Sequence, residues 1–233
     1  VMLQQVGAGQ ALAGLTGGAV PYWAGATGIT LFMIAYVVVA GLRGVAWTDT
    51  LQGVFMLGVV WVAVAWVLSS AGGLSTVSAG LAESNPEFLA LGGAPAANAP
   101  YSVQYVVATA VTIAFGVTMF PQINQRFFVA RDATVLKRSF ALWPIMVLLL
   151  FVPAFLLGTW AAGLGISVPE GENVLPLLLV EYTPLGFAAL VVAGALAAMM
   201  SSSDSMLLSG SSYLTRDLYR PLVDPDASDT REG

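Results

Sequence analysis

The residue types best suited to binding a ligand gather in one apolar stretch near the carboxyl end of the chain. Segment 194–205 reads Gly-Ala-Leu-Ala-Ala-Met-Met-Ser-Ser-Ser-Asp-Ser, so hydroxyls and one carboxylate follow a run of small apolar residues. In a helix, Ala198, Ser201 and Ser202 stand at i, i+3 and i+4 and share one face. Hydroxyl and backbone carbonyl oxygens on such a face can replace the water shell of a hard monovalent cation. The pattern therefore indicates a candidate cation site.

The same small residues also fit a purely structural role. Gly194 and Ala198 form a small-xxx-small pair, which lets neighbouring membrane helices pack closely. Asp204 favours a functional role, because ionisable residues at membrane depth are costly and usually functional. Spacing alone leaves both interpretations open.

Membrane helices are the elements expected to position these residues. The chain has 233 residues, 58% hydrophobic and only 9% charged, with a mean hydropathy of +0.83. A globular domain carries charge on about a quarter of its residues, so this excess of apolar side chains is expected to face lipid. The absence of Cys and His excludes thiolate and imidazole chemistry. We therefore expect an all-α, polytopic integral membrane helix bundle that is not an enzyme.

Uncharged stretches long enough for the ~20 residues of a membrane-crossing helix divide the chain. We expect one transmembrane domain over 1–233, with short helices lying against the outer face in the 69–100 and 173–180 segments. The predicted spans are a truncated first helix at about 1–15 and then 20–42, 48–70, 101–124, 139–164 and 184–214.

The charged residues indicate how these spans are oriented. Cations fall at alternate ends of the spans, and cytoplasmic loops of membrane proteins are enriched in Lys and Arg. This places 43–47, 125–139 and 215–233 in the cytoplasm, and 71–100 and 165–183 outside. The cations interpreted as orientation determinants in the second of these loops are Arg126, Arg131, Lys137 and Arg138.

The 101–124 span is expected to be broken. Gly116 in its middle and Pro121 near its inner end weaken the helix, which predicts an unwound patch at 116–118. Freed backbone groups at membrane depth are tolerated where they line a cavity. Polar residues on this span and on the first helix are therefore candidate substrate or gate contacts, although each fits an interhelical hydrogen bond equally well. They are Gln4, Gln5, Thr118, Gln122 and Asn124.

Three motifs resemble the sodium/solute symporter family. The first is Gly41-Leu-Arg-Gly-Val-Ala-Trp-Thr-Asp49-Thr-Leu-Gln-Gly53, similar to the family's Gly-Leu-Arg turn followed by Trp-Thr-Asp. The second is Ala197-Ala-Met-Met-Ser-Ser-Ser-Asp-Ser205 with Ser-Ser-Tyr-Leu-Thr-Arg-Asp-Leu-Tyr at 211–219. The third is Pro121-Gln-Ile-Asn-Gln-Arg126-Phe, similar to the family's Pro-x-x-x-x-Arg-Phe stretch. The likeness covers nearly the whole chain in the expected order.

The resemblance implies part of a five-plus-five inverted-repeat transporter core of the leucine-transporter type. On that template Ala198 offers its carbonyl to sodium, and Ser201 and Ser202 offer hydroxyl or carbonyl oxygens. Asp49, together with Asp204 and Ser205, would form a second sodium position or a release path. Asp49 also fits a simpler role, as a charge that stabilises the start of a helix.

The function implied is sodium-coupled symport of a small organic solute by alternating access in the plasma membrane. The solute class is an amino acid, monocarboxylate, sugar or vitamin. Sodium is the coupling ion, with no other cofactor. We expect the lipid bilayer as the environment and no nucleic-acid partner. The sequence does not predict the oligomeric state. The chain is expected to be an internal fragment that does not transport alone.

Two rival functions are considered on the same helices. A channel or sensor would favour a continuous polar stripe through several spans, which the sequence does not contain. A membrane-embedded enzyme would need carboxylates or His at mid-depth, and only Asp204 comes close.

Overall fold

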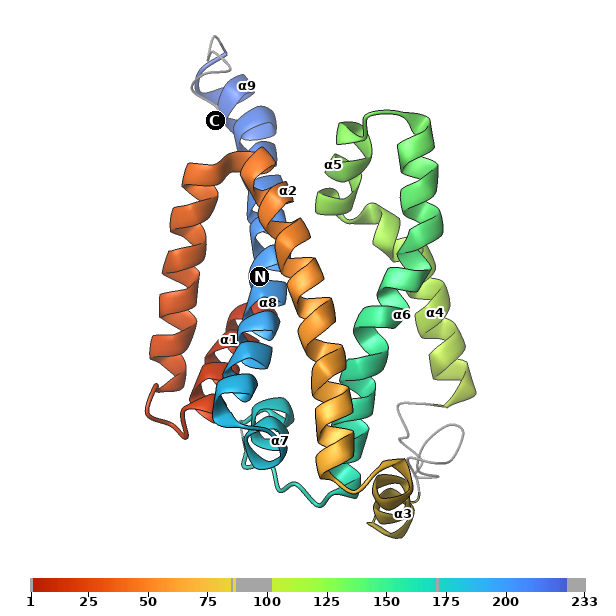
Figure 1. Ribbon diagram of the computed structural model, residues 1–233. Helices are drawn as coiled ribbons and strands as arrows, with labels where there is room; N and C mark the ends of the chain where they lie inside the picture. The colour runs from red at the N-terminus through yellow and green to blue at the C-terminus, as the bar shows by residue number, and fades with distance from the viewer. Residues whose placement is uncertain (1, 85, 87–101, 171, 226–233) are drawn as a thin grey trace.

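The computed structural model describes residues 2–84, 86, 102–170 and 172–225, and these positions contain helices and connections without any strand (Figure 1). Besides α-helices, they include a 3-10 segment, Val117–Met119, and a π-helical turn, Leu214–Tyr219. The prediction of an all-α fold is confirmed. The helices are α1 (Met2–Leu15), α2 (Tyr22–Ser70), α3 (Leu74–Ser84), α4 (Val103–Gly116), α5 (Pro121–Val129), α6 (Ala133–Gly163), α7 (Val174–Tyr182), α8 (Leu185–Tyr213) and α9 (Arg220–Leu222).

Helix α2 consists of two limbs that fold back on each other at Gly41 (Figure 1). Gly41 has φ 59° and ψ −172°, a conformation that residues with a Cβ rarely adopt and that glycine accepts without strain. The turn lies within the Gly-Leu-Arg motif. It separates two candidate membrane spans, Tyr22–Val39 and Gly44–Ser70.

Within the described residues, four helical stretches are long and apolar enough to cross a membrane. Besides the two limbs of α2, they are Ala133–Gly163 and Leu185–Leu222. A fifth span arises if the bent pair Val103–Met119 and Pro121–Phe128 crosses as one unit. The fold is therefore a polytopic helix bundle, as predicted.

The break in this pair lies slightly beyond the predicted patch. Gly116 keeps helical backbone angles, and the chain becomes extended only at Phe120, with φ −70° and ψ 122°. Proline disfavours the helical region for the residue before it, so Pro121 places the break at Phe120. The two helices meet there at a bend of 54°.

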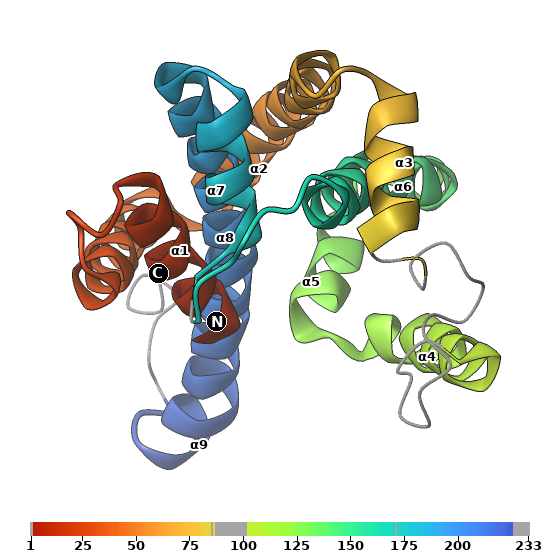
Figure 2. The same cartoon turned by 90° about the horizontal axis from the view of Figure 1, so that it is seen from below.

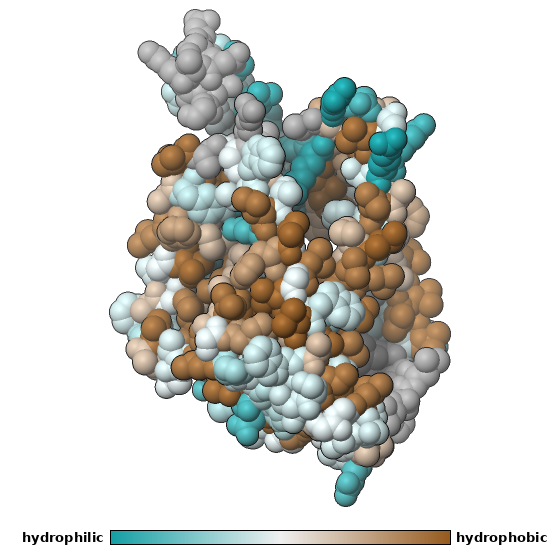
Figure 3. All heavy atoms as spheres, in the orientation of Figure 1, coloured by the Kyte–Doolittle hydropathy of each residue, from teal (hydrophilic) through white to brown (hydrophobic). Residues whose placement is uncertain are grey.

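Charged residues separate to the two ends of the bundle. The α2 turn, the α5–α6 connection and α9 lie at one end, whereas α3 and α7 lie at the other (Figure 1). Hydrophobic side chains dominate the middle of the face in Figure 3, and hydrophilic ones gather toward its ends. The first end carries the described cations of the chain, and the second carries Glu83 on α3 and Glu181 on α7.

The buried core lies around α8, which packs against α1 and both limbs of α2. Toward α3 and α7, a large apolar cluster joins α2, α3, α6, α7 and α8. A smaller cluster of Met33, Val37 and Val45 packs against Leu207 and Leu208 of α8. In contrast, α4 has no buried residue in its length.

The two short helices α3 and α7 occupy the segments in which surface helices were predicted, although residues 87–101 of the first segment lie outside the described positions. Helix α3 lies across the end of α6 (Figure 2) and approaches it closely at two glycines. A Cβ on Gly80 would collide with the carbonyl oxygen of Gly163, and a Cβ on Gly163 would lie 2.8 Å from the carbonyl of Val77. Glycine at both positions therefore permits this packing.

Candidate cation site

Ala198, Ser201 and Ser202 lie half-buried on α8, within a candidate membrane span. The Ser202 hydroxyl donates to the Ala198 carbonyl at 3.1 Å, and the Ser205 hydroxyl donates to the Ser201 carbonyl at 3.0 Å. Each of these carbonyls also accepts the helical N–H four residues further along, so its two lone pairs are used within α8, whereas the two hydroxyl oxygens keep lone pairs for a ligand. The serine turn therefore presents oxygens along one partly accessible helix face.

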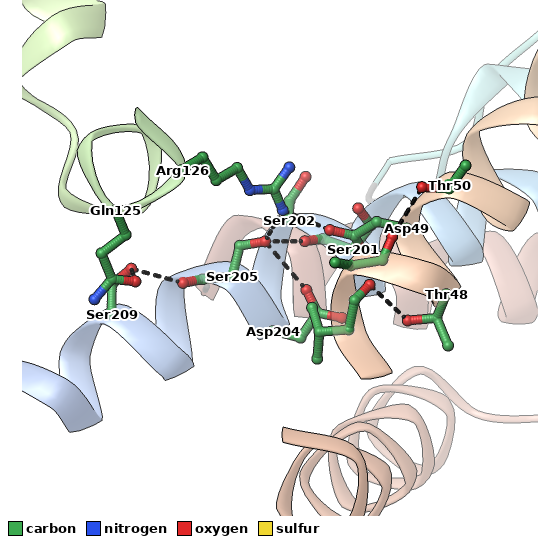
Figure 4. A network of polar contacts seen from close by, with 12 residues as sticks. Thr48, Asp49, Thr50, Gln125, Arg126, Ser201, Ser202, Asp204, Ser205 and Ser209 are labelled. Atoms are coloured by element: carbon green, nitrogen blue, oxygen red, sulfur yellow. Dashed lines mark hydrogen bonds and ion pairs between the residues drawn. The ribbon is translucent and has the colours of Figure 1, made fainter. Parts of the chain in front are cut away.

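One helical turn further along α8, Arg126 joins three helices (Figure 4). Its Nη2 lies 2.5 Å from Asp49 Oδ2 on α2 and 2.6 Å from Ser205 Oγ on α8. The Asp49 side chain is 11% exposed and the Arg126 side chain is 57% exposed. Asp49 and Ser205, predicted to act together, are therefore brought together by a guanidinium from α5.

Asp204 is held differently from Asp49. It is fully buried, and its Oδ2 accepts a hydrogen bond from the hydroxyl of Tyr36 in the first limb of α2. Its Oδ1 lies 3.4 Å from Ser205 Oγ. Asp204 thus lies beside the Asp49 cluster, which consists of Asp49, Arg126 and Ser205. Its hydrogen bond from Tyr36 joins it to the first limb of α2, whereas Asp49 lies on the second limb.

Two acceptor oxygens in this region have no hydrogen-bond partner among the described residues. They are Asp49 Oδ1 and Gln52 Oε1, both buried. These residues stand at i and i+3 on α2, so they lie on the same helix face. Buried polar atoms are nearly always paired, so these two oxygens are candidate ligands for a bound cation. The atoms that could coordinate an ion here are oxygens, which suit hard cations.

Gln5 connects α1 to the opposite side of the serine turn. Its Oε1 accepts from Thr30 Oγ1 at 2.8 Å, and its Nε2 lies 3.5 Å from Ser203 Oγ. Gln5 therefore makes the interhelical hydrogen bonds that the alternative interpretation predicted. Gln4 is half-buried on the same helix.

The candidate gate residues of the broken span do not join the Asp49 cluster. Thr118 is exposed, and its hydroxyl donates to the Phe115 carbonyl of its own segment at 2.9 Å. Gln122 and Asn124 are half-buried on α5. The α5 side chains that reach α8 are Arg126 and Gln125, whose Oε1 lies 2.9 Å from Ser209 Oγ (Figure 4).

Sequence reasoning missed the roles of four residues in this region. Arg126 was interpreted only as an orientation determinant, although its place after the predicted break was a signal that it could reach another span. Gln52, three residues after Asp49, was recognisable from helical spacing. Tyr36 and Gln125 carried no signal beyond being polar within or beside a span.

Comparison with known proteins gives the family. The model of the sodium:solute symporter family matches residues 1–232. The sodium/pantothenate symporter of Haemophilus influenzae is 24% identical over 79% of this chain and 37% of its own length. The sodium/pantothenate symporter of Escherichia coli is 27% identical over 88% of this chain and 42% of its own length. The sodium/sialic acid symporter SiaT of Proteus mirabilis is 28% identical over 83% of this chain and 41% of its own length.

These relatives set the scale of the match. The chain spans about two fifths of their length (37%, 42% and 41%), and no solved structure matches it. All three relatives are named as symporters, and none of them is named as an enzyme. The chain belongs to the sodium:solute symporter family.

Proposed function

We propose that this chain is the central part of a plasma-membrane carrier that couples sodium entry to uptake of a small organic solute by alternating access. The observation that carries the proposal is the oxygen-bearing face of α8, half-buried inside a candidate span. Family membership supports sodium as the ion that this face binds. The end that carries the α2 turn, α5 and α9 faces the cytoplasm, because cations concentrate there, and the 215–233 segment is assigned to the same side.

Sodium binds at the serine turn of α8 in this proposal. The Ala198 carbonyl and the oxygens of Ser201 and Ser202 replace part of its hydration shell. The hydrogen bonds from Ser202 to Ala198 and from Ser205 to Ser201 hold these oxygens in place. Binding stabilises the conformation for which sodium has the higher affinity, which we take to be the outward-open one that accepts solute.

Asp49, Ser205 and Asp204 form a second sodium position or a release path toward the cytoplasm. The contact of Asp49 and Ser205 with one guanidinium supports this assignment, since the same oxygens suit a sodium ion. The unpartnered Asp49 Oδ1 adds a further ligand. Asp204 lies next to Ser205 and contributes negative charge from within the α2–α8 contact.

The solute is a small organic molecule. Relatives are named for pantothenate, sialic acid, proline and glucose, a range that includes the amino acid, monocarboxylate, sugar and vitamin classes. Candidate contacts in this chain are Gln4, Gln5, Thr118, Gln122 and Asn124. One sodium moving through 100 mV supplies about 2.3 kcal/mol, enough for a solute concentration ratio of about 50.

The test is sodium-stimulated uptake by the intact carrier across a panel of labelled solutes. Ser201→Ala and Ser202→Ala should each raise the sodium concentration for half-maximal uptake by about tenfold, because a ligand oxygen is lost. Ser211→Ala is the matched control, since Ser211 is exposed and its hydroxyl bonds only the Leu208 carbonyl of α8. Unchanged sodium dependence in both site variants would refute the assignment.

A further inference from the structure

Arg126 places a positive charge of the protein itself on the position proposed for the second sodium. The guanidinium takes one Asp49 carboxylate oxygen and the Ser205 hydroxyl. It leaves Asp49 Oδ1 and Gln52 Oε1 buried without a donor. The site is thus only partly satisfied by Arg126, although buried polar atoms are normally paired.

We infer that Arg126 is a tethered competitor of sodium at Asp49 and Ser205, so that the guanidinium and the ion occupy this position alternately. The inference rests on the proposed function, because it requires sodium to reach Asp49. In the state seen here, Arg126 holds the position and links α5 to α2 and α8. A sodium ion at Asp49 displaces Arg126 and thereby releases α5.

Electrostatics make the two occupants mutually exclusive. Two positive charges a few ångströms apart repel strongly in a partly desolvated site, and Asp49 is the one carboxylate that Arg126 contacts. Asp204 adds negative charge beside Ser205, but its Oδ2 accepts from Tyr36, and among the described residues no ion pair joins it to Arg126. The guanidinium can leave at low cost, because its side chain is 57% exposed and water is available to solvate it.

The consequence for α5 follows from its few attachments. A break at Phe120 separates α5 from α4, so α5 can move without carrying α4 as a rigid rod. Among the described residues, its other side-chain hydrogen bond to α8 is the Gln125–Ser209 contact at 2.9 Å. Displacing Arg126 therefore removes the charged one of these two links and loosens α5 where it contacts α8.

The direct test measures binding of radioactive sodium to the purified intact carrier, with potassium replacing sodium to keep ionic strength constant. Arg126→Gln should tighten sodium binding by about fivefold to tenfold, because the competitor is gone. Arg126→Lys keeps a positive charge at this position, so its sodium binding should remain as weak as that of the unchanged carrier. Adding Asp49→Asn to Arg126→Gln should abolish the gain. Arg131→Gln is the control for the lost positive charge. The Arg131 side chain is 91% exposed, and its ion pair is a long one, 3.8 Å from Nε to Asp132 Oδ2.

Outcomes against the inference are distinct from failure of the proposed function. Sodium binding that is unchanged or weaker in Arg126→Gln, while Ser201→Ala still weakens it, overturns the competitor role and leaves the carrier assignment intact. Loss of any response to Ser201→Ala and Ser202→Ala overturns the proposed function instead.

A second measurement does not depend on the Arg126 variants folding. Ser209 is 2% exposed and lies against Gln125, and the chain contains no Cys. Ser209→Cys, in a carrier without other cysteines, should react faster with a water-soluble thiol reagent in sodium than in potassium, because α5 is released. A rate that is equal or slower in sodium contradicts the inference.

Discussion

The helices around α8 and the broken pair α4–α5 differ in how they are held. On α8, Ser203, Asp204 and Ser209 are buried, and hydrogen bonds from Gln5 and Tyr36 tie the helix to α1 and α2. Helix α4 has no buried residue, and its main contacts are with the 3-10 segment that continues it. The difference separates a tightly packed part, which holds the oxygens proposed to bind sodium, from a part that has few packing contacts beyond those of α5.

Two carboxylates show the same contrast at atomic scale. The Tyr36–Asp204 hydrogen bond lies inside the α2–α8 contact, so breaking it leaves polar groups without water. The Asp49–Arg126 ion pair is reached by solvent through Arg126, so breaking it lets the guanidinium hydrate. The first bond favours a rigid contact, and the second is suited to repeated opening.

The largest expected effect on stability comes from replacing one methionine in each of the two regions. Met33 on α2 is fully buried, whereas Met119 beyond α4 is 78% exposed. Met33→Ala should destabilise the intact carrier by about 2–5 kcal/mol, because a cavity forms among packed side chains. Met119→Ala should stay within about 0.5 kcal/mol. Thermal unfolding in detergent measures both, and equal losses in the two variants would remove the contrast between the regions.

A smaller effect is expected at the buried hydrogen bond. Tyr36→Phe removes the donor to Asp204 and should cost about 1–3 kcal/mol, because a buried acceptor is left unpaired. Asp204→Asn keeps an acceptor for Tyr36 and should cost less. Arg126→Gln breaks the Asp49 ion pair, which solvent reaches through the half-exposed guanidinium, and should cost about 0–1 kcal/mol. Thermal unfolding orders the three variants, and the comparison fails if Arg126→Gln is the most destabilising.

Hydrophobic patterning predicted a helical membrane bundle, and the family resemblance predicted the turn between the limbs of α2. Long uncharged stretches and Gly-Leu-Arg at the turn are local signals, and the structure follows them at Gly41. The break was predicted from Gly116 and Pro121, with an unwound patch at 116–118. The α-helix does end at Gly116 and becomes a 3-10 turn, but the chain turns extended only at Phe120, because Pro121 disfavours the helical region for the residue before it.

Contacts between distant side chains were beyond such patterns. The resemblance grouped Asp49 with Ser205, but nothing in either motif specifies that Arg126 bridges them or that Tyr36 takes Asp204. These pairings depend on how α2, α5 and α8 rotate and pack, and residues 36, 49, 126 and 204 are far apart in sequence. Local spacing carries no information about that rotation.

The smallest expected effect, on both stability and sodium affinity, is that of a substitution at Thr118 in the broken span. Thr118 was a candidate gate contact, yet it is exposed and its hydroxyl returns to the Phe115 carbonyl. Thr118→Val preserves the shape and removes the hydroxyl, so stability should change by less than about 0.5 kcal/mol. Sodium affinity should change by less than about twofold, a free-energy change of about 0.4 kcal/mol. Sodium titration of uptake compares this variant with Ser202→Ala, whose hydroxyl also bonds a carbonyl of its own helix but lies on the half-buried face of α8. If Thr118→Val weakens sodium binding as much as Ser202→Ala, the broken helix holds the ion as well, and the division between fixed and moving parts no longer stands.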